Sequence, residues 1–143
     1  METGTGPNPK NCPSGWLPFR TFCYKINTVA TSYESARSAC QQTPNTDLVS
    51  ITDDYEFNFV RSLIYRNIDK PPTNNENVIE PGAWLGLTVS KSGGDMRYQW
   101  VDQFPFAKSY WDENEPNQDL IPNSPSKACV AMNLPYGNWG IVS

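Results

Sequence analysis

Oxygen-bearing side chains are concentrated in residues 111–120, which read WDENEPNQDL. The candidate oxygen ligands among them are the side chains of Asp112, Glu113, Glu115, Asn117 and Asp119. Proteins bind calcium through about six to eight such oxygens, and carboxylates are prominent among them. The stretch therefore suggests a calcium site centred on residues 115–117.

A lysine follows the acidic stretch. Lys127 stands eight residues after Asp119 and directly before a predicted apolar strand. Two like charges about 4 Å apart repel by about 4 kcal/mol at an effective dielectric near 20, so an ammonium beside the ion disfavours calcium. A family resemblance, carried by the motifs described below, implies that Lys127 stands at the ion's position, and we expect it to replace the ion and donate hydrogen bonds to Glu115 and Asn117.

The remaining acids of the stretch, Asp112, Glu113 and Asp119, have two interpretations. Acidic side chains in a polar loop are typically solvated surface residues. Alternatively, they form an irregular and weak calcium site together with Glu115.

The sequence offers no residues for common catalytic chemistry. It contains no histidine, which removes the usual general base and the partner of Ser and Cys nucleophiles. The absence of histidine and of any Cys-x-x-Cys pair also argues against structural zinc. An enzyme that uses only carboxylates, such as a glycosidase, is formally compatible, but we expect a protein without catalytic residues.

Length and charge limit the remaining classes. The chain has 143 residues, enough for one domain with one core, and its net charge is −4. Its 11 basic residues are scattered, which excludes a nucleic-acid surface and a basic membrane patch. No apolar run approaches the roughly 18 residues of a membrane span. Residues 1–10 hold no apolar stretch that would act as a secretory signal, so we interpret them as a disordered leader or a remnant of processing or expression.

Residues 11–143 contain the predicted elements. Turn residues and alternating apolar positions predict a hairpin over 12–26, in which Cys12 and Cys23 form a disulfide; two core thiols are the alternative. Capping-box spacing predicts helices that begin near Thr31 and Asp53. Apolar or alternating runs predict strands at 47–51, 83–89, 96–102, 127–133 and 138–143, whereas the composition of 68–82 predicts a loop. This order of elements indicates an α+β domain.

Seven segments carry a resemblance to a known family. In chain order they are CPSGWLPFRTFCY, LVSI, WLGL, YQWVD, YWDENEPN, ACVAM and GNWGIVS. Together they resemble the C-type lectin-like domain in its long form, and they are similar to modules of mannose-receptor-type endocytic receptors. The resemblance implies two helices that flank two small antiparallel sheets, with a long loop region at one end. It also implies that Trp84, Leu85 and Leu87 are core residues.

The resemblance also implies roles for other residues. Trp100, Trp111 and Trp139 are expected to anchor loops rather than stack on sugars. In sugar-binding members of the family, five side chains hold the principal calcium, and Glu115 and Asn117 match the Glu-Pro-Asn pair with its cis proline. Lys127, Gly140 and Ile141 stand at the other three positions. We therefore expect no metal; if calcium is retained, its ligands are Glu115, Asn117 and Asp119.

Two further disulfides of the family each lack one of their cysteines in this sequence. In the family, the cysteine at the position of Cys40 pairs with one in the last strand, and that at the position of Cys129 pairs with one just after the Gly-x-Trp strand. The resemblance therefore implies a domain without its closing strand, which is either a fragment or completed by another segment. A direct Cys40–Cys129 bond is the alternative.

These observations predict an extracellular recognition module, either secreted or part of a receptor ectodomain. We expect it to bind a protein or another ligand without calcium, through Glu115, Asn117, Asp119 and Lys127 in the loop region 114–133, with the 69–82 loop as a second candidate. One alternative is a calcium-dependent, mannose-type lectin that uses Glu115 and Asn117 and binds glycans. Another is a structural spacer in a tandem array.

Overall fold

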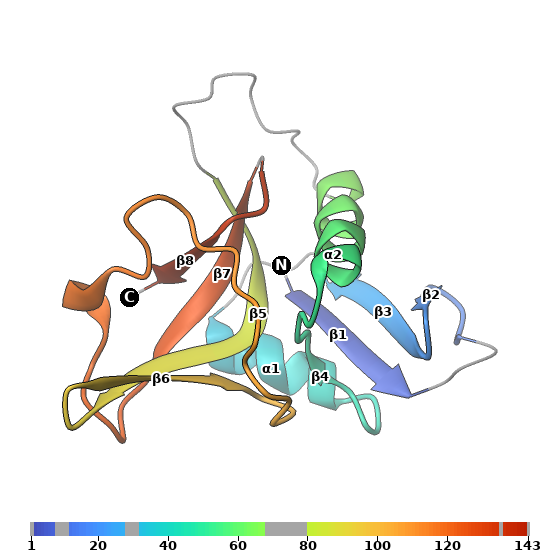
Figure 1. The fold of residues 1–143 in the computed structure, drawn as a ribbon. Coiled ribbons are helices and arrows are strands. Elements are labelled where there is room, and N and C mark those ends of the chain that lie inside the picture. Colours follow the sequence, from blue (N-terminus) through green and yellow to red (C-terminus); the bar gives the residue numbers. More distant parts are fainter. Residues whose placement is uncertain (1, 8–11, 28–31, 68–79, 135, 143) are drawn as a thin grey trace.

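The computed structural model describes residues 2–7, 12–27, 32–67, 80–134 and 136–142. Its helices are α1 (Tyr33–Gln41), α2 (Asp54–Arg66) and the 3-10 helix η1 (Gln118–Leu120). Its strands are β1 (Glu2–Pro7), β2 (Leu17–Phe19), β3 (Phe22–Asn27), β4 (Asp47–Leu48), β5 (Glu80–Ser92), β6 (Asp95–Trp100), β7 (Ala128–Leu134) and β8 (Trp139–Val142). Figure 1 shows their arrangement.

The strands form two small antiparallel sheets. One contains β2, β3, β1 and β4, and the other contains β6, β5, β7 and β8. The two are joined where Glu2 of β1 pairs in parallel with Trp84 of β5. Figure 1 shows the first sheet on the right beside α2 and the second on the left, with the long loop after β6 at its outer end. The predicted α+β architecture of two helices and two small sheets is confirmed.

Strand β1 corrects the interpretation of residues 1–10 as a disordered leader. Residues 2–7 pair in antiparallel register with all of β3, from Glu2↔Asn27 to Pro7↔Phe22. Their sequence, ETGTGP, has low strand propensity, but ladder hydrogen bonds use only backbone groups. Residues 2–7 therefore add a strand to the first hairpin.

The two helices begin at side-chain caps. Ser32 caps α1 by accepting a hydrogen bond from the backbone N–H of Ser35 at 3.3 Å, one residue after the predicted cap at Thr31, which lies outside the described residues. Asp53 caps α2 as predicted, and accepts from the N–H of Glu56 at 2.9 Å. The predicted inward face of α1, Tyr33, Ala36 and Cys40, is buried.

The carboxylate of Asp53 makes the free energy of unfolding depend on pH in the acid range. Its pKa lies below the usual 3.8, first because the N–H of Glu56 donates to it and then because Arg20 contacts it at 2.7 Å. A carboxyl group with a lowered folded-state pKa stabilises the fold above its unfolded pKa, and that contribution is lost as the pH falls through the folded value. We expect Asp53→Asn to flatten the acid decline of the unfolding free energy below about pH 4. Urea melts across this range test it against Asp95→Asn, an exposed control; equal slopes for the two variants would contradict it.

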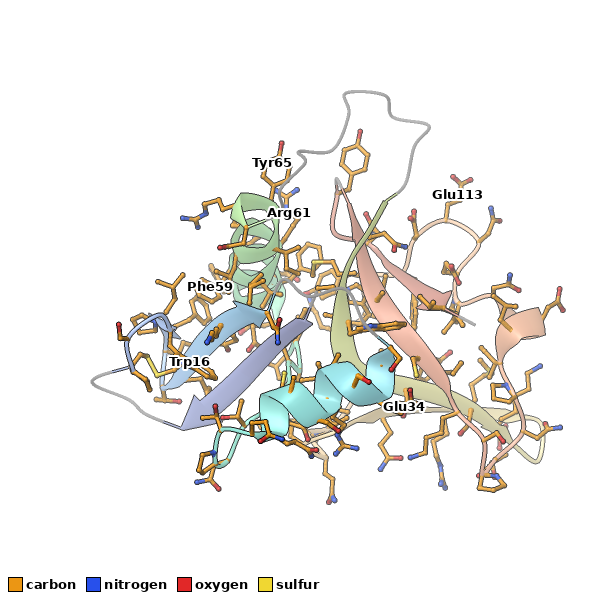
Figure 2. The ribbon with its side chains drawn as sticks, turned by 180° about the vertical axis from the view of Figure 1, so that it is seen from behind. Trp16, Glu34, Phe59, Arg61, Tyr65 and Glu113 are labelled. Carbon is orange, nitrogen blue, oxygen red and sulfur yellow. A yellow bond between two sulfur atoms is a disulfide. The ribbon has the colours of Figure 1, made fainter. Side chains whose placement is uncertain are left out.

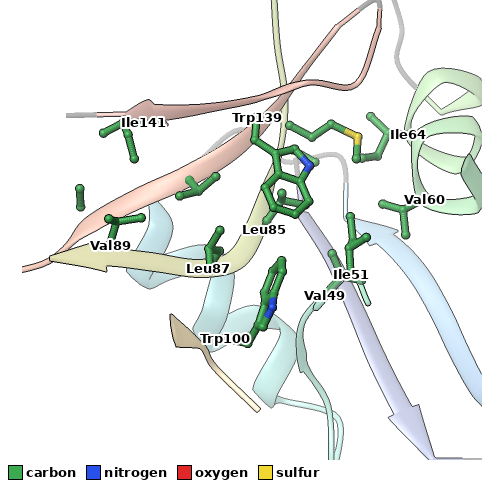
Figure 3. Packing of buried hydrophobic residues seen from close by; sticks show 14 of the residues in the cluster. Val49, Ile51, Val60, Ile64, Leu85, Leu87, Val89, Trp100, Trp139 and Ile141 are labelled. Carbon is green, nitrogen blue, oxygen red and sulfur yellow. The ribbon is translucent and has the colours of Figure 1, made fainter. Parts of the chain in front are cut away.

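The core forms around β5. Leu85 and Leu87 are fully buried there, together with Trp100 and Trp139, as Figure 3 shows. Trp84 faces the other side of β5, where its ring lies edge-on to Tyr33 of α1 with the ring centroids 5.6 Å apart. The predicted core positions Trp84, Leu85 and Leu87 are therefore packed as expected, in two clusters on opposite faces of one strand.

Candidate functional site

The loop after β6 is anchored on Trp139 of β8. The Trp139 ring lies edge-on to those of Trp100, Trp111 and Tyr110, with centroids 5.6, 5.8 and 5.3 Å away. Its backbone N–H donates to the carbonyl of Tyr110 at 2.7 Å, and its carbonyl accepts from the N–H of Asp112 at 2.9 Å. These contacts confirm that the three tryptophans anchor the loop, as predicted. They also hold Asp112, the first acid of the stretch, in place beside β8.

The side-chain oxygens of the Glu-Pro-Asn segment bond to the loop itself. The Glu115–Pro116 peptide bond is cis, as the resemblance implied. One carboxylate oxygen of Glu115 accepts from the N–H of Asn117 at 2.8 Å. The amide oxygen of Asn117 accepts from the N–H of Asp119 at 3.1 Å and caps η1. Both side chains thus stabilise the loop conformation through local hydrogen bonds.

Gly140 leaves the space that the other oxygen of Glu115 fills. A Cβ atom at Gly140 would lie 2.9 Å from Glu115 Oε2 and 2.7 Å from Asn133 Nδ2. Sequence analysis placed Asn133 only at the end of the loop region and gave it no role at this site. The glycine at position 140 was the one indication in the sequence that another side chain packs there, because it leaves room for a neighbour.

Lys127 does not join this group, which corrects the predicted ion pair. The ion pairs among the described residues are Arg20–Asp53, Arg37–Asp47 and Lys108–Asp54. Lys127 instead lines a cavity of about 530 Å³ beside α1, next to Glu34 and Cys129. Figure 2 shows Glu34 at the end of α1 that lies beside β7.

Strand alternation explains where Lys127 lies. Ala128, Val130 and Met132 of β7 belong to the main core cluster, so alternate residues of the strand face the other way. Cys129 accordingly packs against the cluster on α1, and Lys127 precedes it with the same parity. The match of Lys127 to a ligand position in the sequence does not indicate on which side of β7 the residue lies.

The lysine that reaches the loop is Lys91, at the end of β5. Its ammonium donates to the carbonyl of Gln118 at 3.0 Å. Its backbone N–H donates to Pro122 at 2.9 Å, and its carbonyl accepts from Ser124 at 2.8 Å. Lys91 thereby pins the segment 118–124 against the sheet. Sequence analysis missed it because these partners are distant along the chain.

The candidate calcium ligands of the loop are bonded locally or exposed. No group of three or more Asp, Glu, His or Cys side chains in this part of the chain is placed to hold a metal. Glu115 and Asn117 already accept hydrogen bonds from the loop, while Gly140 and Ile141 have no side-chain oxygens. Asp112 accepts from the N–H of Glu113, and Glu113 and Asp119 are exposed; Figure 2 shows Glu113 on the outside of the loop.

The predicted disulfide of the first hairpin is confirmed. Cys12 and Cys23 form a disulfide, with their Cα atoms 5.6 Å apart. Cys129 is a half-buried thiol, so the alternative of a Cys40–Cys129 bond is not realised. Burial, with a smaller effect of the nearby Glu34 carboxylate, raises the pKa of Cys129 to about 11. This thiol is therefore protonated at neutral pH.

The fold and the loop together define a lectin-like recognition domain rather than an enzyme fold. Residues 29–143 match the model of the lectin C-type domain, and the chain belongs to this family. It is 32% identical over 139 residues to C-type lectin lectoxin-Lio3 of Erythrolamprus poecilogyrus, covering 94% of this chain and 74% of that protein.

Longer proteins contain similar segments. Human lymphocyte antigen 75 is 30% identical over 132 residues, which is 92% of this chain but only 7% of that protein's length. Among solved structures, the cow carbohydrate-recognition domain of CD23, determined with a GlcNAc2Man3 oligosaccharide, superposes with a TM-score of 0.65 at 27% identity. That match covers 92% of this chain and 85% of the CD23 chain. Within the described residues, neither helix is long and apolar enough to cross a bilayer.

Proposed function

We propose that this domain is an extracellular recognition module that binds a protein or another ligand without calcium. The observation that carries the proposal is the bonding of Glu115 and Asn117, whose oxygens accept loop N–H groups at 2.8 and 3.1 Å. Calcium would have to share these two oxygens with the loop N–H groups, and it would gain no side-chain oxygen from Gly140 or Ile141. The loop is instead held by Lys91 and by the aromatic anchors around Trp139.

The proposed recognition surface lies on the outer side of this loop. Asn117 and Asp119 are exposed there, and Glu115 is half-buried beside them. Their hydrogen bonds to the backbone fix their positions, and preorganised polar groups bind with a smaller entropy loss. Lys127, the fourth predicted ligand-binding residue, is exposed and lines the cavity beside α1, so we expect it to contribute to a separate part of the surface.

The proposed extracellular localisation rests on the disulfide bond. Disulfides such as Cys12–Cys23 persist in oxidising compartments, which supports a secreted protein or a receptor ectodomain. We propose no catalytic role, because the sequence contains no histidine and the family is lectin-like.

A calcium-dependent, mannose-type lectin is the second candidate. Its support is the retained Glu115-Pro116-Asn117 segment, together with the similarity to the CD23 domain solved with an oligosaccharide. A spacer in a tandem array is the third candidate, consistent with the small share of lymphocyte antigen 75 that the chain covers.

Thermal melts separate these candidates. We expect the same melting temperature in millimolar calcium and in EDTA, and no EDTA-sensitive retention on mannose resin. A ligand at about 100 times its Kd stabilises a fold by about 2.7 kcal/mol, so calcium binding would raise the melting temperature clearly. A calcium-dependent rise that Glu115→Gln removes, and that Glu113→Gln leaves intact, would favour the lectin and contradict the proposal. A spacer would show no ligand in binding screens with the isolated domain.

A further inference from the structure

We propose that a small acidic cavity between β3, the first turn of α2 and the segment after β6 binds a lysine side chain of a protein partner. The cavity has a volume of about 70 Å³. It uses none of the loop residues that carry the proposed calcium-free function, and therefore forms a second, independent site.

Ser50 lines the cavity and carries a hydroxyl group that has no hydrogen-bond partner among the described residues. Ser50 is 6% exposed, and its buried Oγ makes no hydrogen bond to the described residues. Leaving such a buried group unsatisfied destabilises the unliganded state. A ligand that hydrogen-bonds to Ser50 recovers this free energy on binding.

A buried carboxylate lies beside Ser50. Glu56 is 7% exposed; its Oε1 accepts from the N–H and the hydroxyl of Thr52 at 2.8 and 2.9 Å. Among the described residues, its Oε2 accepts from the hydroxyl of Tyr24, and the second lone pair of that oxygen is open there. Glu56 stands three residues after the cap Asp53, at capping-box spacing, and its carboxylate lines this cavity.

The charges around the cavity favour a cation. Asp102 lines it as a second carboxylate, and one oxygen of Asp102 accepts from the N–H of Phe104 at 3.1 Å. The one basic residue of the lining, Arg20, is paired with Asp53 at 2.7 Å. Neither Glu56 nor Asp102 has an ion-pair partner among the described residues, so two negative charges remain.

The open acceptors match the donors of an ammonium group. Ser50 Oγ, Glu56 Oε2 and the second oxygen of Asp102 provide three acceptors, and a lysine ammonium has three N–H donors. A planar guanidinium presents five donors in a rigid fork and requires a wider site. The acceptor set and the small volume therefore favour lysine over arginine.

Two exposed aromatic rings favour a side chain on a protein surface over a free amine. Phe22 and Phe104 line the same cavity and are 37% and 51% exposed. They can pack along the methylene groups of lysine, and their ring faces attract its charge. Beyond the cavity they offer apolar area that a partner protein can cover.

NMR titration of the isotope-labelled chain tests this proposal with acetyl-Gly-Lys-Gly-amide as the probe. The control probe is acetyl-Gly-norleucine-Gly-amide, which has a similar stem but no charge. We expect the lysine peptide to shift the amide resonances of Phe22, Ser50 and Phe104, with a Kd on the order of 1 mM, and the norleucine peptide to shift them much less. Asp102→Asn is expected to weaken binding about tenfold, or about 1.4 kcal/mol.

Two further comparisons make the test decisive. Ser50→Ala is expected to weaken lysine binding, while Asp95→Asn removes one charge at the exposed start of β6 and is expected to leave it unchanged. If the buried Ser50→Ala variant fails to fold, the exposed Asp102→Asn variant still tests the site. Equal shifts with both peptides, or equal effects of the two aspartate substitutions, would overturn the proposal. Saturation of the same resonances by calcium chloride, with the peptide displaced, would identify a metal site and also overturn it.

Discussion

Replacing Trp139 with alanine is expected to lower the free energy of unfolding by about 3–5 kcal/mol. Trp139 is fully buried, and its ring packs against those of Trp100, Tyr110 and Trp111. The substitution removes a large apolar surface from the core and the packing partner of the loop at the same point. Urea denaturation measures the first effect, and amide chemical shifts across 110–119 measure the second.

Two variants provide controls for Trp139→Ala. Trp139→Phe keeps a ring and removes an indole N–H that is buried without a hydrogen-bond partner in the described structure, so we expect a much smaller loss. Tyr55→Ala removes an aromatic side chain that is 74% exposed and should change stability by less than about 0.5 kcal/mol. A Trp139→Ala variant with unchanged loop resonances would show that the loop does not depend on this anchor.

Gly86→Ala is expected to cost about 3 kcal/mol, the upper range for overpacking. A Cβ atom at Gly86 would lie 2.7 Å from Val101 Cγ2, and 2.8 and 3.0 Å from the carbonyl oxygens of Leu48 and Val49. Two of these contacts are backbone, so the strain is relieved only by moving β5 away from the link before α2. The N–H of Gly86 also donates to Val49 at 2.7 Å, and the movement would lengthen this bond.

Ser92→Ala is the matched control for Gly86→Ala. Ser92 lies at the exposed end of the same strand, and its substitution should stay within about 0.5 kcal/mol of the parent. Thermal and urea melts of both variants test the expectation. Equal stability of Gly86→Ala and the parent would mean that β5 and the Val49 carbonyl do not approach as closely as the structure shows.

Elements with a local signal could be predicted from the sequence. The WLGL strand is a continuous apolar run, and Asp53 precedes a helix with the spacing of an N-cap; both are where the sequence placed them. The Cys12–Cys23 disulfide also lies within one predicted hairpin. The roles of Trp100, Trp111 and Trp139 came from the family resemblance, and their ring contacts agree with it.

Features that depend on distant contacts could not be predicted in this way. Strand β1, with the sequence ETGTGP, has no apolar periodicity and is held by backbone pairing to β3. Lys91 reaches the loop across 27 residues, and no periodicity in the sequence marks that contact. Lys127 matches a ligand position in the sequence, but strand alternation places it on the side that faces α1. Glu56 has capping-box spacing, yet its carboxylate accepts from the hydroxyl of Tyr24, 32 residues earlier in the chain, as well as from the N–H of Thr52.

Isothermal titration calorimetry with calcium tests the central claim most directly. The chain is titrated with calcium chloride up to about 10 mM, above the weakest range of extracellular calcium modules. We expect only the heat of dilution, and the same trace for the parent and for Glu115→Gln. A saturable heat that disappears in Glu115→Gln would show that the Glu-Pro-Asn loop binds the ion, and would contradict the account.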